Sequence, residues 1–195
     1  MADAKVMEFL HGKSVALVGN AQSIFDTAHG KAIDAHDVVI RFNRGFITAP
    51  VAQGSKTDIL FLACELTAEE LQRFGAKFTI NRSSKTQCGD ITLDDIYRRR
   101  YRKKYDAYPS TGMMAIKICI TAGAKRIDLY GFDFGKTQTY YNPADYVTKH
   151  DFATEEAIIK GWQEIEMSRH KFNYNAHMAE HTDVSDRTLR RKYNK

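Results

Sequence analysis

Two asparagines stand directly after apolar runs that are typical of buried strands. Asn20 follows "SVALVG", in which Gly19 is the single glycine, and Asn43 follows "VVIRF". A third polar stretch, "YPSTG", opens a helical pattern, and Ser110 or Thr111 would cap that helix and leave N–H groups facing an anion. These donors are too few for a triphosphate with its magnesium and suit the single phosphate of a nucleoside monophosphate. The alternative is that asparagine after a strand only forms a turn.

A histidine and a glutamate, His150 and Glu155, stand at the start of the last helical pattern. They occur in "HDFATE", at the end of a polar loop over residues 132–152 and before a long helix predicted over 153–178. Polar loops of that length are usually functional in compact domains. Histidine titrates near neutral pH and suits a general base on an alcohol, and the helix dipole would lower its pKa. The alternative is that His150 only caps the helix.

Alternating strand and helix patterns must position these groups. Apolar β-branched runs predict strands over residues 14–19, 37–41, 58–63, 77–80 and 126–131. Helices are predicted between them over 22–29, 67–74, 93–101 and 112–122, with a capping-box signature at Thr67 and Glu70. This alternation predicts a single α/β domain over residues 1–195, with a central, mainly parallel sheet flanked by helices. Ligands of such sheets bind beyond the carboxyl ends of the strands, where Asn20, Asn43 and Phe132–Asp133 should lie.

The composition favours an anionic partner. The 195 residues carry a net charge of +5, and no run approaches the ~20 apolar residues of a membrane helix. Three cysteines without metal-ligand spacing predict reduced thiols, no metal site and a cytoplasmic protein.

The segment "YRRRYRKKY", residues 97–105, is the most basic, with six basic residues from Arg98 to Lys104. A solvated helix face is one interpretation, and an anionic lipid, an anionic acceptor glycan or single-stranded nucleic acid are the functional ones. With a second basic cluster over 187–195, it favours a peripheral enzyme that works on envelope glycans at the inner face of a membrane. The alternative of another class is a non-catalytic nucleic-acid-binding protein.

Four motifs in order resemble those of glycosyltransferase family 29, the sialyltransferases. Residues 14–45 are similar to the large sialylmotif and 108–134 to the small one, while "TYYNP" and "HDFATE" resemble the third and very small motifs. The stretch "QGSKTD" also matches the family just after the large motif. The resemblance implies an inverting, metal-independent enzyme that moves an acidic sugar from its CMP-activated form to an acceptor hydroxyl. It also implies a single-domain variant of the nucleotide-sugar transferase fold, GT-A-like and Rossmann-like.

The resemblance assigns roles by position. Asn20 and Asn43 would hold the phosphate and ribose of CMP, and Tyr108 would add a phosphate hydrogen bond. His150 would be the general base on the acceptor hydroxyl, and Glu155 would support the site around it. The remaining donor-binding residues would be Ser110, Thr111, Gly112, Phe132, Asp133, Thr139 and Tyr140.

The sequence departs from the family at two points. Val15 and Gly123 stand where animal members form a disulfide, which agrees with a reducing compartment and a bacterial-type enzyme. Thr139 stands where many animal members have a histidine that helps the phosphate to leave, so that Tyr140 or Tyr141 would have to replace it. Sialic acid is the favoured donor sugar. Kdo remains the alternative, because no motif residue is expected to distinguish the side chains of the two sugars. The expected partners are a CMP-sugar and a glycan or glycolipid acceptor, without a cofactor or nucleic acid.

Overall fold

The computed structural model describes residues 3–93, 96–142 and 147–167. One sheet of six strands runs in the order β5-β4-β3-β2-β1-β6, and every neighbouring pair is parallel. The strands are β1 (Ser14–Val18), β2 (Val38–Phe42), β3 (Ile59–Leu62), β4 (Phe78–Asn81), β5 (Ile91–Thr92) and β6 (Arg126–Tyr130). The predicted α/β fold is therefore confirmed, and only the two-residue strand β5 was not predicted.

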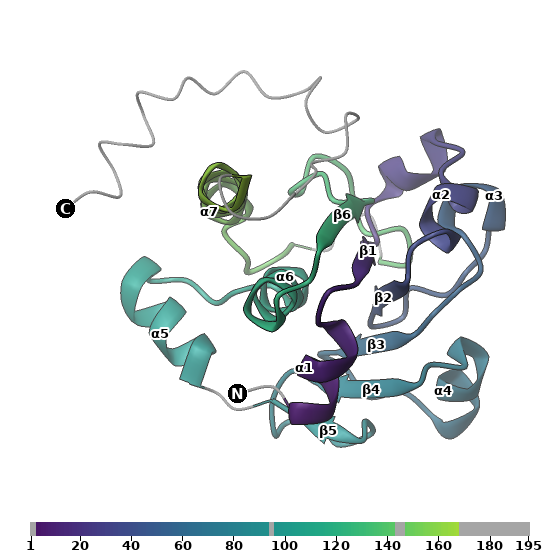
Figure 1. Cartoon of the computed structure of the whole chain (residues 1–195), viewed down its shortest axis with the longest axis horizontal. Helices are drawn as coiled ribbons and strands as arrows, with labels where there is room; N and C mark the ends of the chain where they lie inside the picture. The colour runs from purple at the N-terminus through teal and green to yellow at the C-terminus, as the bar shows by residue number, and fades with distance from the viewer. Residues whose placement is uncertain (1–2, 94–95, 143–146, 168–195) are drawn as a thin grey trace.

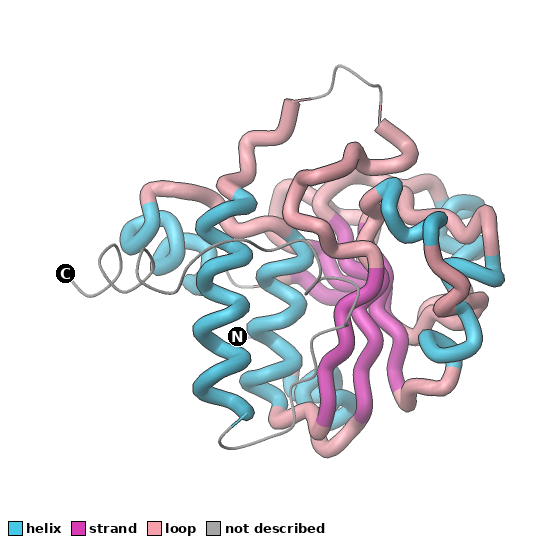
Figure 2. Tube along the Cα trace, turned by 90° about the horizontal axis from the view of Figure 1, so that it is seen from above, coloured by secondary structure: helices cyan, strands magenta, loops and turns pink. Residues whose placement is uncertain are grey.

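Helices cover both faces of this sheet. They are α1 (Ala4–Leu10), the 3₁₀ helix η1 (Gln22–Asp26), α2 (Gly30–Asp34), α3 (Pro50–Gln53), α4 (Ala68–Phe74), α5 (Ile96–Tyr105), α6 (Thr111–Ala122) and α7 (Phe152–Met167). Helices α1, α5, α6 and α7 lie on one side of the sheet, and α2, α3 and α4 lie on the other (Figure 1). The view from above shows the same three layers (Figure 2). No helix of the described residues is both long and apolar enough to span a bilayer.

The strands are apolar on both faces, as parallel strands between two helical layers must be. Leu17, Ile40 and Phe61 belong to the larger core cluster, which includes residues of α1 and α6. Their neighbours Ala16 and Val39 pack on the opposite side, against η1 and α2. A rigid sheet results, and it fixes the loops that follow its carboxyl ends.

Several predicted helix boundaries differ from the observed ones. The pattern over 22–29 is a 3₁₀ helix that ends before Thr27, whose hydroxyl and N–H both donate to the carbonyl of Ile24, at 2.7 Å and 3.3 Å. The pattern over 93–101 is displaced to α5, because the N–H of Leu93 bonds the carbonyl of Asn81 at 2.9 Å and continues the sheet. Helix α7 begins one residue before the predicted start, and the predicted end at 178 lies outside the described residues.

The order of the strands reverses at β1. The chain passes from β1 through β5 on one side of the sheet and then returns to place β6 on the other side of β1. Such a switch point is where ligands of open parallel sheets bind. Gly19 lies there, and a Cβ on it would come within 2.4 Å of the carbonyl oxygen of Gly131. The lone glycine therefore lets two chain segments meet and is not part of a phosphate cradle.

Candidate active site

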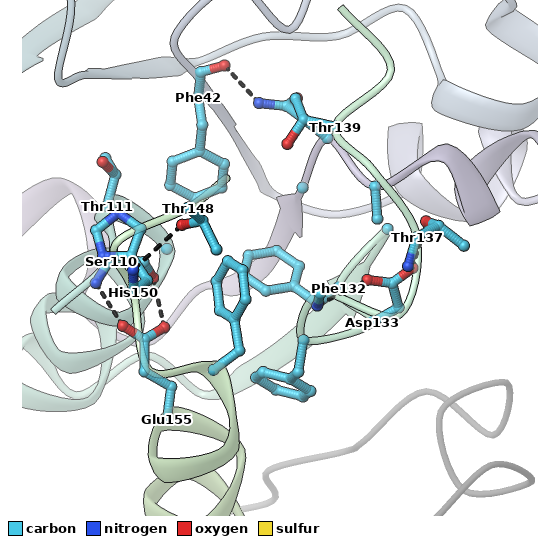
Figure 3. Close-up of a pocket in the computed structure, with 18 of the residues that line it drawn as sticks. Phe42, Ser110, Thr111, Phe132, Asp133, Thr137, Thr139, Thr148, His150 and Glu155 are labelled. Carbon is cyan, nitrogen blue, oxygen red and sulfur yellow. Dashed lines mark hydrogen bonds between the residues drawn. The ribbon is translucent and has the colours of Figure 1, made fainter. Parts of the chain in front are cut away.

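A cavity of about 280 Å³ lies beyond the carboxyl ends of β1, β2 and β6, next to the N-termini of α6 and α7. All predicted site residues line it except Tyr108 and Tyr140. Figure 3 shows Ser110, His150 and Glu155 on one side, with Phe132 and Asp133 on the other. Sequence reasoning did not single out several further lining residues, among them Phe42, Asn142, Thr148 and Phe152.

Two asparagines and a tyrosine form one end of the cavity, called here the amide end. The Nδ2 of Asn20 donates to the carbonyl of Phe42 at 2.9 Å and to the hydroxyl of Tyr141 at 3.3 Å. Asn43 has a left-handed backbone, with φ of 51°, and its Oδ1 accepts from the N–H of Ala63 at 2.7 Å. Both side chains are thus held in fixed orientations by main-chain groups at the carboxyl ends of β2 and β3.

Of the two tyrosines in the third motif, Tyr141 faces the cavity and Tyr140 does not. The hydroxyl of Tyr140 donates to the carbonyl of Phe46 at 3.0 Å, and its ring packs against Phe25. Burial raises the pKa of Tyr141 to about 12, with a smaller opposing effect from hydrogen bonds to Asn20 and Asn43. Tyr141 therefore keeps its proton at neutral pH and can donate it in a hydrogen bond.

The loop after β6 is folded by its own aspartate. Asp133 accepts from the hydroxyl of Ser23 at 2.9 Å, from the N–H of Thr137 at 3.0 Å and from the N–H of Gly135 at 3.1 Å. Thr139 pairs with Ala21 in a single antiparallel bridge, which ties this loop to the turn after β1. The carboxylate thus shapes the cavity wall by binding donors of its own loop and of η1.

Phe132 forms an apolar wall, and Gly112 makes room for it. A Cβ on Gly112 would come within 2.6 Å of the Phe132 ring. The ring of Phe132 also meets that of Phe42 edge-on, with 5.9 Å between centroids. The glycine in "YPSTG" is therefore required by packing at the cavity wall.

The histidine end of the cavity contains His150, and Asp151 decides its role in the helix. Asp151 precedes α7, and its Oδ1 accepts from the N–H of Thr154 at 3.0 Å, as a helix cap does. The cap interpretation of His150 is therefore wrong, and the imidazole is available for another purpose.

The ring of His150 is held in one tautomer. Its Nδ1 lies 3.2 Å from the carbonyl oxygen of Tyr108, which can only accept, so Nδ1 carries the proton. Nε2 then keeps its lone pair. Burial lowers the pKa of His150 from its usual value, the bond to Tyr108 opposes this, and the charge of Arg82 adds to the lowering. The sequence also predicts a lowered pKa for His150. The helix dipole is the cause expected from the sequence, whereas burial is the main cause in the structure.

Glu155 joins the two helix N-termini. It is 2% exposed, and its carboxylate accepts from the N–H of Ser110 at 2.5 Å and from the Ser110 hydroxyl at 2.6 Å. Ser110 in turn caps α6 by accepting from the N–H of Met113 at 3.1 Å, so that Thr111 is the first residue of the helix. Burial raises the pKa of Glu155 to about 7, against the lowering effect of the Ser110 bonds.

The side chain of Tyr108 points away from the cavity. It is 43% exposed, and the guanidinium of Arg102 lies 4.7 Å from its ring centroid. Its carbonyl holds His150, so this residue contributes to the site through its main chain. Among the described residues no group of three or more His, Cys, Asp or Glu could hold a metal ion.

Comparison with known proteins agrees with this architecture. Residues 3–88 match the model of glycosyltransferase family 29 (sialyltransferase). The monofunctional α-2,3-sialyltransferase Cst-I from Campylobacter jejuni superposes with a TM-score of 0.62 at 15% identity, over 95% of this chain and 82% of that chain. CstII from Campylobacter jejuni, in complex with CMP-3FNeuAc, gives 0.57 at 14% identity, over 83% and 81%. A mammalian sialyltransferase in complex with Gal-β-1-3GalNAc-ortho-nitrophenol gives 0.57 at 20%, over 84% and 69%.

No curated protein matches the sequence. The structural matches establish a shared fold, and the family model assigns the segment that supplies β1 to β4 and the asparagines of the amide end. The resemblance found in the sequence motifs is thereby confirmed. Residues 3–88 thus match the sialyltransferase family, family 29, and the chain as a whole shares its fold with sialyltransferases.

Proposed function

We propose that the protein transfers sialic acid from CMP-sialic acid to a glycan hydroxyl, with inversion and without a metal ion. His150 is the general base in this proposal. The observation that carries it is the state of the His150 ring, whose Nδ1–H is bonded to the Tyr108 carbonyl and whose pKa is lowered. A partly buried imidazole in this state offers Nε2 as a proton acceptor near neutral pH.

The reaction is a single displacement. The acceptor oxygen bonds to the anomeric carbon of the sugar while the bond from that carbon to the CMP phosphate oxygen breaks, and the hydroxyl proton passes to Nε2 of His150. CMP leaves as a phosphate monoester, which a few preorganised donors stabilise without a divalent cation. Asn20 and Asn43 hold the phosphate and ribose, supported by their common place in the cavity wall.

Tyr141 donates to the departing phosphate in place of the family's histidine. Its hydroxyl lies between the amides of Asn20 and Asn43, and its raised pKa keeps it protonated. Thr139 lines the same cavity at the motif position itself. Tyr140 takes no part, since its hydroxyl is bonded to Phe46.

The test measures CMP binding by calorimetry and CMP release from CMP-sialic acid by chromatography, with a neutral galactoside as acceptor. We expect CMP to bind more tightly than UMP or GMP, and the galactoside to accelerate its release. CMP-Kdo is tested as the competing donor. If the enzyme turns over CMP-Kdo faster than CMP-sialic acid, Kdo takes the place of sialic acid as the proposed donor sugar. Failure to bind CMP would overturn it altogether.

A further inference from the structure

Helix α5 has two unlike faces. The inner face carries Tyr97, Tyr101 and Tyr105, which pack into the larger core cluster, and Tyr101 is only 3% exposed. The helix lies at the edge of the molecule, beyond α6 as seen from the sheet (Figure 1). The outer face carries five exposed cations, Arg99, Arg100, Arg102, Lys103 and Lys104.

Four of these cations have no acidic partner in the described fold. Within the part of the chain that the structure describes, Arg99, Arg100, Lys103 and Lys104 form no ion pair. Arg99 with Lys103, and Arg100 with Lys104, are like-charge pairs four residues apart, which destabilise a helix. Burial of the three tyrosines holds the helix in place despite this repulsion. A surface that keeps such a charge pattern suits an anionic partner.

Exposed apolar groups flank the basic face. Ile96 at the start of α5 is 41% exposed, and Tyr108, three residues after its end, is 43% exposed. Tyrosine and aliphatic groups beside a row of cations are typical of surfaces that sit at the membrane interface. Because the carbonyl of Tyr108 binds His150, this surface borders the histidine end of the cavity.

We propose that the outer face of α5, together with Ile96 and Tyr108, docks onto a membrane surface rich in anionic lipid. Clusters of four to eight Lys and Arg side chains bind such surfaces. Single-stranded nucleic acid needs exposed aromatic rings on which bases stack, whereas the tyrosines interleaved in this segment are turned into the core. The docking is independent of the proposed reaction, since none of the five cations lines the cavity.

The experiment uses the whole protein and sedimented vesicles of phosphatidylcholine, with and without 30 mol% phosphatidylserine. The test variant replaces Arg99, Arg100, Lys103 and Lys104 by glutamine, which preserves helix propensity. The matched control replaces four exposed lysines elsewhere, Lys5, Lys13, Lys31 and Lys125, and changes the net charge equally. CMP affinity and thermal unfolding are measured on all three proteins.

We expect the wild-type protein and the control to bind the anionic vesicles and to be released by 0.5 M salt. The test variant should bind them about 1,000-fold more weakly, with unchanged CMP affinity and an unfolding temperature no lower than that of the wild-type protein. Equal binding of the test variant and the control, or equal binding to neutral vesicles, would overturn the proposal. Tighter binding of a single-stranded oligonucleotide or of heparin than of the vesicles would also overturn the proposal. The outer face of α5 would then be assigned to nucleic acid or to an anionic glycan.

Discussion

The two ends of the cavity are built in different ways. At the amide end, Asn20 and Asn43 follow central strands, and main-chain groups at the ends of the neighbouring strands hold their side chains. At the histidine end, no residue lies on a strand. His150 is positioned by the carbonyl of Tyr108, and Glu155 connects α7 to the first turn of α6 through Ser110.

The difference suggests a division of labour. The amide end is neutral, fixed by the sheet and rich in hydrogen-bond groups, which suits binding of the donor. The histidine end holds two titratable groups whose pKa values burial shifts in opposite directions, that of His150 downward and that of Glu155 upward to about 7. Proton transfer and sensitivity to pH should therefore be confined to the histidine end.

The largest expected effect is that of His150→Asn. Asparagine can still donate to the Tyr108 carbonyl but cannot take the acceptor's proton, so transfer should fall by about 10²–10⁴-fold. CMP affinity by calorimetry should stay within twofold. The wild-type rate should fall only below pH 6.5, because burial lowers the pKa of His150. Near wild-type turnover in this variant would show that a group other than His150 is the general base.

The next effect is on stability. Since the folded pKa of Glu155 lies near 7, above its ordinary value of 4.5, the folded state holds the proton more tightly than the unfolded state does. Its contribution is complete below pH 4.5 and is lost as the pH rises through 7. The free energy of unfolding should decline by at most about 3 kcal/mol over this window.

Glu155→Gln should remove the part of this decline in the free energy of unfolding that Glu155 causes, because glutamine does not titrate. Denaturant unfolding of both proteins at pH 5 and pH 7.5 gives the change in unfolding free energy for each. Subtracting one change from the other cancels the contributions of other titrating groups. Parallel pH dependences in the two proteins would show that Glu155 stays ionised throughout.

At the amide end, Asn20→Ala and Asn43→Ala should each weaken CMP binding by about 1–3 kcal/mol, the cost of losing a hydrogen bond to a charged group. Neither should change the pH profile of turnover. Asn81→Ala is the control, since Asn81 bonds Gly89 within the sheet edge and does not line the cavity. Unchanged CMP affinity in both variants would make the two asparagines purely structural.

The smallest expected effect is that of EDTA, which should leave turnover unchanged. One phosphate monoester requires no divalent clamp when fixed donors surround it. Loss of activity that manganese or magnesium restores would contradict the neutral character assigned to the amide end.

Five of the six strands and the capping box of α4 were predictable, because burial of both faces of the sheet imposes continuous apolar runs, and because Thr67 and Glu70 act locally. The short helices α1, α2 and α3 were missed. Helix α2, for example, starts at Gly30, where a Cβ would lie 2.0 Å from the carbonyl oxygen of Pro50, so that a long-range contact determines it.

Most of the site could be predicted from motif position, but side-chain direction could not. The sequence does not distinguish the adjacent residues Tyr140 and Tyr141. In the structure, long-range contacts to Phe46 and Asn20 hold Tyr140 away from the cavity and Tyr141 in its wall. Likewise, Tyr108 acts through its carbonyl, and nothing in its side-chain type signals that.

The place of β1 between β2 and β6 has a consequence for synthesis of the chain. Residues 3–88 supply β1 to β4, yet β1 lacks one of its two neighbours until residues 126–130 have been made. Val15 to Val18 are almost completely buried in the finished sheet. At about 5–20 residues per second, a growing chain carries this apolar edge unpaired for several seconds. An open edge of that kind recruits other strands, so a ribosome that stalls in this interval should release an aggregating fragment.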